Sequence, residues 1–158
     1  MESVRRKLVS VLLTFFLLSC LRNPDNASSK LDGHWYAVYG DSRQLYGEAI
    51  YKDGHACFYS DYFGLRYRTY KIKSDSILEI YDRQMLDNKC KLSFSNLNAM
   101  QQTLVSYEPI NVVNGVVNYY KVADAGISYE KLFALDTAEQ NKFITGFMLR
   151  KAQWEIKK

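Results

Sequence analysis

The order of hydrophobic and polar residues divides this chain into three parts. Residues 8–21 form an unbroken uncharged run that begins directly after a basic cluster. Between residues 33 and 122, short runs rich in aromatic and β-branched residues alternate with turn signals, which is typical of β-strands. Beyond Val122 the spacing of apolar residues lengthens to that of a helix.

The middle part contains eight candidate strands, each about five to eight residues long. Asp53-Gly54 supplies the positive φ angles of a tight hairpin, and Ser74-Asp75 and Asn114-Gly115 mark further turns. Because short turns join sequence neighbours, we predict an antiparallel meander closed, or nearly closed, into a barrel, which removes the exposed edges. An open, curved sheet with the C-terminal helix packed on it is the alternative. The runs are HWYAVYG, QLYGEAIYKDGHACFYSDY (two strands), LRYRTYKIKSDSILEIYD (two strands), KCKLSFS, QTLVSYE and GVVNYYKV.

The last part predicts a helix over about residues 136–154. Asp136 is a typical N-cap residue, and Glu139 follows three positions later, as in a capping box. Basic residues gather toward the carboxyl end, where the helix dipole favours cations. A ninth strand over residues 142–149 is the alternative, since Gly146 weakens a helix. Aromatic residues spaced by four and seven share one helical face: Phe143, Phe147 and Trp154.

The uncharged run near the N-terminus has the form of a secretion signal. Arg5, Arg6 and Lys7 precede it, and its 14 residues are fewer than the about 20 that a membrane-spanning helix needs. A buried core helix is the alternative, but the basic cluster in front of the run and its lack of a polar face favour a signal. The sequence therefore predicts a signal peptide at residues 1–19 and an exported mature chain.

The end of this run, Leu17-Leu18-Ser19-Cys20, resembles the lipobox of bacterial lipoproteins. The resemblance implies cleavage before Cys20 and acylation of that residue with chains such as palmitate, which would anchor the protein to a membrane. Residues 20–32, rich in Asn and Ser, predict a flexible tether. By the same resemblance, Leu21 implies the outer membrane, because lipoproteins kept in the inner membrane often have aspartate after the cysteine. The acidic cluster that directs some lipoproteins of Bacteroidota to the cell surface is absent apart from Asp25, which favours the periplasmic face. A chance cysteine with cleavage elsewhere is the alternative.

Charge and cysteine content narrow the picture further. The signal holds three of the 21 basic residues and one of the 17 acidic ones, so the mature chain has a net charge of +2. This charge gives no support for nucleic-acid binding. Cys57 and Cys90 remain, and two cysteines in an oxidising compartment predict a disulfide. Such a bond would close a loop of about 33 residues and add roughly 3–4 kcal/mol to stability.

The start of the domain at residues 33–158, Gly33-His34-Trp35, resembles the G-x-W motif of lipocalins and of short lipocalin-like lipoproteins of Bacteroidota. The resemblance implies a barrel whose closed end is plugged by Trp35 and covered by a late arginine, for which Arg150 is the candidate. It also implies a small lipophilic ligand inside the barrel. The short predicted strands argue against a deep calyx.

Arg66, Arg68 and Tyr70 are the candidate binding residues, because strand alternation places them on one face. If that face points inward, two arginines between aromatic walls can hold an anionic headgroup or carboxylate. If it points outward, the strand is simply solvated. His55 and Cys57 also share a face, but this pair alone makes neither a metal site nor a catalytic set. We therefore predict no metal, no cofactor and no enzymatic activity.

Two functions are compatible with these patterns. In the first, a membrane-anchored envelope lipoprotein binds a small apolar or amphipathic molecule inside its barrel. In the second, the barrel is filled and the chain is a protein-binding module, such as an inhibitor, an immunity protein or an envelope-complex subunit. The second function predicts a contiguous exposed patch of tyrosines.

Overall fold

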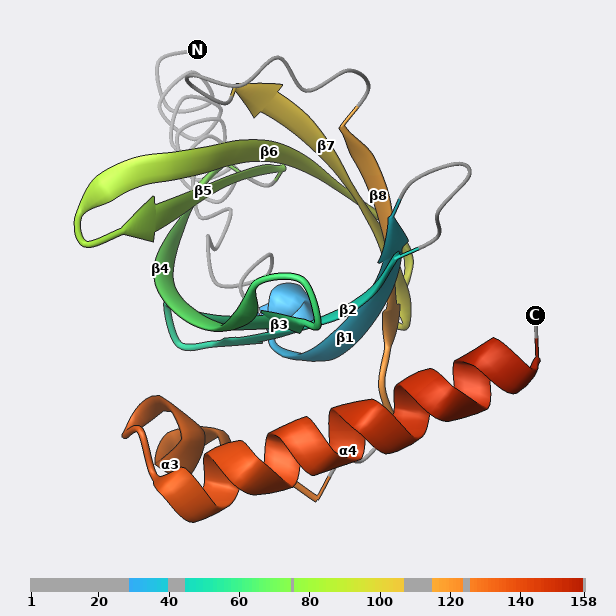
Figure 1. The fold of residues 1–158 in the computed structure, drawn as a ribbon. Helices are drawn as coiled ribbons and strands as arrows, with labels where there is room; N and C mark the ends of the chain where they lie inside the picture. Colours follow the sequence, from blue (N-terminus) through green and yellow to red (C-terminus); the bar gives the residue numbers. More distant parts are fainter. Residues whose placement is uncertain (1–28, 40–44, 75, 107–114, 124–125, 158) are drawn as a thin grey trace, which may run out of the picture.

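The computed structural model describes residues 29–39, 45–74, 76–106, 115–123 and 126–157. They contain a closed barrel of eight antiparallel strands in sequence order, in which β8 pairs back to β1 (Figure 1). The mainly β fold, the meander and its closure are thereby confirmed. The predicted signal peptide, Cys20 and most of the tether lie outside the described residues. The strands are β1 (Gly33–Tyr39), β2 (Leu45–Lys52), β3 (His55–Ser60), β4 (Gly64–Ser74), β5 (Ile77–Asp82), β6 (Met85–Asn96), β7 (Ala99–Ser106) and β8 (Val116–Lys121).

Two strands are longer than the sequence predicted. β4 has 11 residues and β6 has 12. β6 begins at Met85, directly after a turn at Arg83-Gln84 in which both residues have positive φ angles of 47° and 73°. Such turns usually contain glycine or asparagine, so this turn had no signal in the sequence. The predicted hairpin at Asp53-Gly54 is present, with φ angles of 48° and 78°.

Alternate side chains of every strand point into the barrel, as the period of a β-strand requires. Those that point inward form the larger hydrophobic core. Its buried members are Leu31, Trp35, Ala37, Ala49, Tyr51, Ala56, Tyr70, Leu78, Ile80, Cys90, Leu92, Met100 and Tyr119.

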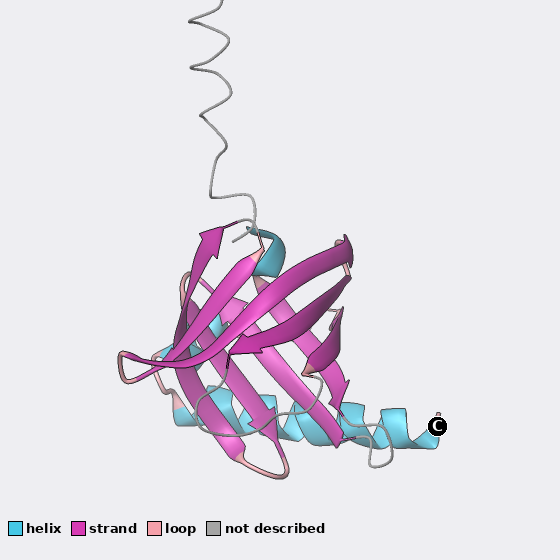
Figure 2. Ribbon diagram, turned by 90° about the horizontal axis from the view of Figure 1, so that it is seen from above, coloured by secondary structure: helices cyan, strands magenta, loops and turns pink. Residues whose placement is uncertain are grey.

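Two helices lie on the outside of the barrel, α3 (Tyr129–Phe133) and α4 (Thr137–Ile156) (Figures 1 and 2). They cover the outward side chains of β1–β4 and form a second core with them, in which Phe143 and Phe147 are fully buried. The C-terminal helix is confirmed, and the ninth strand is wrong. Among the described helices, none is both long and apolar enough to cross a membrane.

The start of α4 differs in one detail from a capping box. The Asp136 side chain accepts a hydrogen bond from the Glu139 amide at 2.8 Å, as predicted. The Glu139 carboxylate, however, accepts from the Ser128 amide at 2.8 Å. Ser128 is itself the N-cap of α3, so Glu139 ties the beginnings of the two helices together.

Candidate functional site

One end of the barrel is closed by a short helix at residues 29–31 (Figure 2). Trp35 is fully buried there, and its indole Nε1 donates to the Leu31 carbonyl at 2.8 Å. The Lys121 ammonium lies over the indole ring, 5.0 Å from its centroid. Gly33 leaves room for this lysine: it has a φ of +135°, and a Cβ atom there would lie 2.7 Å from Lys121 Cε. Trp35 therefore plugs the barrel, with a lysine above it.

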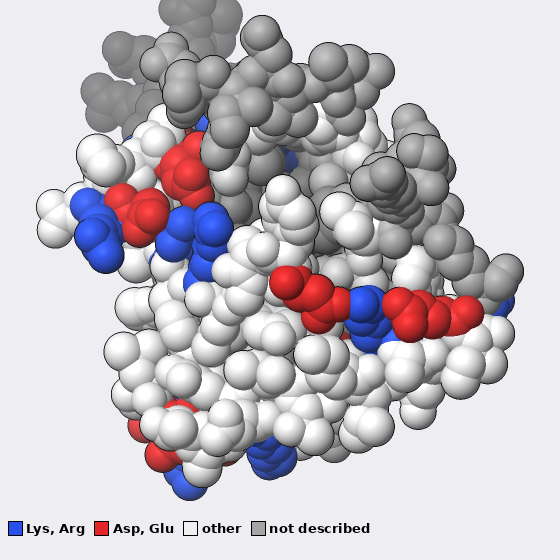
Figure 3. Space-filling model, viewed as in Figure 1, with Lys and Arg blue, Asp and Glu red and all other residues white. Residues whose placement is uncertain are grey.

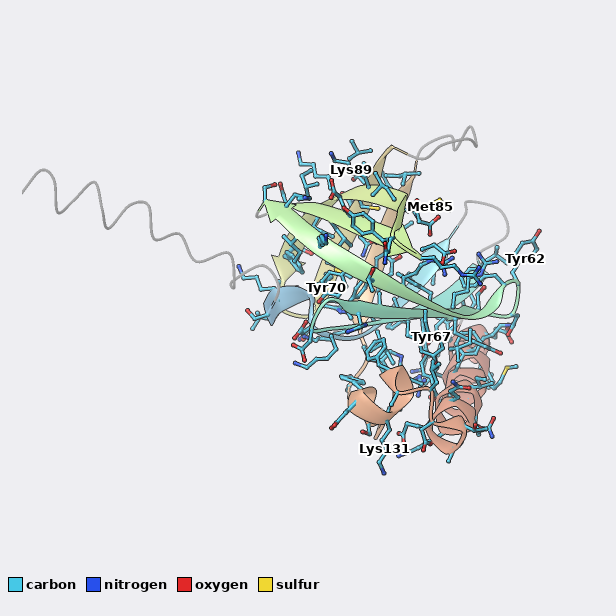
Figure 4. The ribbon with its side chains drawn as sticks, turned by 90° about the vertical axis from the view of Figure 1, so that its left-hand side faces the viewer. Tyr62, Tyr67, Tyr70, Met85, Lys89 and Lys131 are labelled. Carbon is cyan, nitrogen blue, oxygen red and sulfur yellow. The ribbon has the colours of Figure 1, made fainter. Side chains whose placement is uncertain are left out.

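Polar contacts seal the same end. Asp32 accepts a hydrogen bond from Lys52 Nζ at 3.0 Å and another from the Tyr70 hydroxyl at 3.1 Å. Tyr70 lies beside the short helix in Figure 4, whereas Tyr62 and Met85 lie at the opposite end. Tyr70 thus points into the barrel, but it belongs to the closed end and lines no part of the cavity in the other half of the barrel.

The half of the barrel opposite Trp35 encloses a cavity of about 320 Å³. This volume lies near the lower end of the range for small-molecule sites and has room for about ten water-sized groups. Most of its lining is apolar, and polar groups join it toward the mouth, the end of the barrel opposite Trp35. The lining residues are Phe58, Phe63, Arg66, Arg68, Ile80, Asp87, Asn88, Cys90, Gln102, Leu104, Gly115, Val117 and Tyr119.

Arg66 and Arg68 both line this cavity, but within the described ranges only Arg68 has its charge matched. Arg68 donates to Asp87 at 3.2 Å, to the Tyr67 carbonyl at 2.9 Å, and lies 3.1 Å from Asp82. Arg66 is exposed, lies over the Phe63 ring at 5.0 Å, and makes no ion pair with any described residue. An exposed guanidinium therefore lies next to an apolar cavity.

Figure 3, viewed in the same direction as Figure 1, shows that positive and negative groups lie beside one another around this end. Arg68 with its two aspartates is one such group. Another is Lys151, which contacts Asp61 and lies 3.6 Å from Glu155. Cations in such pairs are not free to bind an anion. Of the two arginines that line the cavity, Arg66 is the one without an ion pair among the described residues.

Deeper in the cavity the polar groups are few and satisfied. The Gln102 amide donates to the Tyr51 hydroxyl at 3.0 Å. Cys90 is a wall residue, and burial raises the pKa of its thiol to about 11, so the thiol is neutral at ordinary pH. The inner cavity is thus suited to an apolar group.

The predicted disulfide is wrong. Cys57 and Cys90 are both free and buried. Cys57 belongs to the outer core beneath the helices, whereas Cys90 belongs to the core inside the barrel. The two thiols therefore face opposite sides of the barrel wall, on strands that are not neighbours. A disulfide requires a Cα–Cα distance below about 7 Å, with the side chains directed toward each other.

The predicted position of Arg150 over Trp35 is also wrong. Arg150 is on α4, outside the barrel, and makes two hydrogen bonds of 2.8 Å to the Glu48 carboxylate. Lys121 occupies the expected place of Arg150. Lys121 could have been found from the closure of the barrel, because β8 pairs with β1 and places Lys121 opposite Trp35.

Glu48 is the centre of a buried network between the barrel wall and α4. Besides Arg150, it accepts hydrogen bonds from His34 Nε2 and from the Tyr46 hydroxyl, each at 2.7 Å. Burial alone would raise the pKa of Glu48, but the bonds from Arg150 and His34 outweigh it and lower the pKa to about 2. The carboxylate is therefore charged in the folded protein at ordinary pH, and it fixes α4 against β2.

The remaining candidate pair, His55 and Cys57, lies on the outward face of β3. His55 lies against the Phe133 ring, with centroids 5.6 Å apart, and burial raises the pKa of the Cys57 thiol to about 12. Across the described ranges, no three His, Cys, Asp or Glu side chains come together as a metal site.

No protein-family model, no curated protein and no solved structure matches this chain. The resemblance to lipocalins therefore stays a prediction. The barrel, its cavity and the groups at its mouth are the observations from which a function can be inferred.

Proposed function

We propose that this protein is a lipid-anchored envelope protein that binds a small amphipathic anion inside its barrel. The observation that supports this most directly is an apolar cavity of about 320 Å³ whose mouth carries Arg66, a guanidinium without an ion pair among the described residues. The apolar part of the ligand lies within the barrel, and its carboxylate or phosphate bonds to Arg66. Guanidinium groups suit such oxyanions because they donate two parallel hydrogen bonds.

The cavity favours this function over a protein-binding module with a filled barrel. The alternative also requires a contiguous patch of exposed tyrosines. Of the tyrosines whose side chains the structure describes, only Tyr62 and Tyr120 are exposed. They lie on the β3–β4 turn and on β8, and the other described tyrosines are buried or half-buried.

A series of straight-chain carboxylates tests the proposal on the full-length chain by calorimetry. Each buried methylene contributes about 0.8 kcal/mol, so the dissociation constant falls about fourfold per carbon. Affinity should stop rising at about ten carbons, where the chain fills the cavity. Affinity that does not depend on chain length, or no binding at any length, would refute the proposal.

The role of Arg66 is tested with Arg66→Gln. Loss of a charged hydrogen bond weakens carboxylate binding about tenfold to a hundredfold, while the alcohol of equal length binds both proteins alike. Arg83→Gln is the matched control, because Arg83 is also an exposed arginine near the mouth but lines no part of the cavity. Equal losses in the two variants would indicate a general charge effect instead.

Membrane anchoring is tested separately. Expression of the full chain in a bacterial host with labelled palmitate should label the protein, and Cys20→Ala should abolish the label and the recovery of the protein in membranes washed at high salt, which removes electrostatic binding. A soluble, unlabelled wild-type protein would refute the anchor and leave the ligand proposal standing.

A further inference from the structure

The outer wall that the helices leave uncovered carries a cluster of lysines. Lys71 and Lys73 on β4 and Lys89 and Lys91 on β6 are on the outward positions of the two strands that flank β5. Lys71, Lys73 and Lys91 are exposed, and Lys89 is half-buried. We call these four residues the lysine patch. Figure 4, which faces this side of the barrel, shows Lys89 on the outer surface.

The strand between them offers little to neutralise the patch. Glu79 of β5 lies opposite Lys71 of β4 and opposite Lys89 of β6 in the strand register. It is the acidic residue of β5 that lies among the four lysines. Its nearest ammonium groups are those of Lys89 at 3.6 Å and Lys73 at 3.8 Å. The Tyr81 hydroxyl donates to Glu79 at 2.6 Å and lowers its pKa, so the carboxylate stays charged. Among the described residues, this one carboxylate therefore faces four ammonium groups.

Four like charges gathered around one carboxylate repel one another and reduce stability, so a patch of this kind is best explained by an anionic partner. None of the four lysines lines either of the two nearby cavities. One of these cavities is at the mouth, and the other lies along the first part of β4. A basic surface that extends from β4 across β5 to β6 fits an extended anionic surface better than a single small anion.

Position favours a lipid surface as that partner. The short helix at residues 29–31, from which the chain continues toward Cys20, lies at the closed end, and β4 ends and β5 begins at this end. Only eight residues separate Cys20 from Ser29, which span at most about 30 Å. The exposed tip of the β6–β7 turn, Leu97, is at this end as well and is 72% exposed. An anchored chain therefore has this lysine-rich end near the bilayer.

We infer that the lysine patch binds the anionic headgroups of a lipid bilayer and that the mouth of the barrel then faces away from that bilayer. The inference adds an orientation to the proposed function but does not need the ligand. It also does not need acylation, because each lysine near an anionic surface strengthens binding by itself.

Flotation of the full-length Cys20→Ala chain with vesicles tests the inference without the anchor. Vesicles of phosphatidylcholine with about one third phosphatidylglycerol should bind the protein, and pure phosphatidylcholine should not. The triple variant Lys71→Gln/Lys73→Gln/Lys91→Gln should bind on the order of a hundredfold more weakly, at about fivefold per lysine. Binding should also weaken as salt rises.

The matched control removes the same charge from the helical side, with Lys131→Gln/Lys142→Gln/Lys157→Gln. It should bind the vesicles within about twofold of the parent, apart from the general effect of net charge. Circular dichroism checks that both variants are folded. Equal losses of vesicle binding in the two triple variants, or binding that persists at high salt, would overturn the proposal that the lysine patch binds the headgroups.

Capture of the parent on heparin without any binding to the anionic vesicles would overturn the lipid surface and point to a soluble anionic polymer. Absence of binding to both probes would overturn the inference altogether. Neither outcome bears on the carboxylate series, so the two proposals fail independently.

Discussion

Replacing Arg150 by methionine is expected to destabilise the protein strongly, although the residue lies on the surface side of α4. The Glu48 side chain is fully buried, whereas that of Arg150 is 23% exposed. Removal of the guanidinium leaves a buried carboxylate with only His34 and Tyr46 as partners. Breaking a buried ion pair in this way costs about 3–5 kcal/mol. Because Arg150 is partly solvated, we expect the lower end, about 3 kcal/mol.

The acid dependence of stability provides a second measure of the same interaction. The interval between the ordinary pKa of 4.5 and the value of about 2 in the folded protein corresponds to about 3 kcal/mol. The pKa of Glu48 is lower in the folded than in the unfolded chain. Its contribution is therefore complete above about pH 5 and is lost as the pH falls toward 2. Glu48→Gln should remove this part of the acid dependence and cost about 2 kcal/mol at neutral pH.

Urea unfolding followed by tryptophan fluorescence, at neutral pH and near pH 3, measures both effects. Lys151→Met is the control, since Lys151 is the next residue of α4 and its ion pair with Asp61 is at the surface, where such pairs contribute about 0–1 kcal/mol. If Arg150→Met is no more damaging than Lys151→Met, the network does not hold the helix. An unchanged acid dependence in Glu48→Gln would likewise refute the pKa argument.

Three further outcomes are expected from the barrel. Val117→Phe should fill the cavity and abolish carboxylate binding in calorimetry, whereas Val116→Phe, one residue earlier and exposed, should leave it intact; equal effects would contradict the assigned cavity. The melting temperature should not change with reductant, because Cys57 and Cys90 are free, and a drop of several degrees would show that they form a disulfide after all. Trp35→Ala should cost about 3–5 kcal/mol in urea unfolding, and a smaller loss would mean that the indole does not plug the barrel.

Alternation and turn signals were sufficient to predict the fold. Eight runs with aromatic and β-branched residues, separated by turns such as Asp53-Gly54, predicted a meander, and closure was favoured over an open sheet because it removes the two exposed edges. The helix was predictable because Asp136 caps it and Phe143 and Phe147 share one face. The turn at Arg83-Gln84 was not, because nothing in those residue types indicates positive φ angles.

The site was harder to predict, because period-two alternation separates two faces without saying which one is inside. Cys57 and Cys90 show the consequence: compartment chemistry suggested a pair, but each side chain takes the face that its own strand assigns. Arg150 shows another limit. Order along the chain suggested a late arginine for Trp35, whereas the buried charge of Glu48 requires that arginine on the other side of the wall.

Strand β4 contributes residues to every part of the molecule. Its inward positions run from Arg66 at the mouth to Tyr70 at the closed end. Arg66 is the proposed contact for an anion, and Tyr70 helps to close the other end by its hydrogen bond to Asp32. The outward positions of the strand run from Tyr67, packed beneath the helices, to Lys71 and Lys73, which are half of the lysine patch. A shift of one residue in its register would turn the lysines into the barrel and both arginines to the outer face. The contact of Tyr70 with Asp32 and the packing of Tyr67 with Phe133 on the opposite face both oppose that shift. The register that closes the barrel is therefore also the one that leaves a cation at the mouth and a basic surface at the other end.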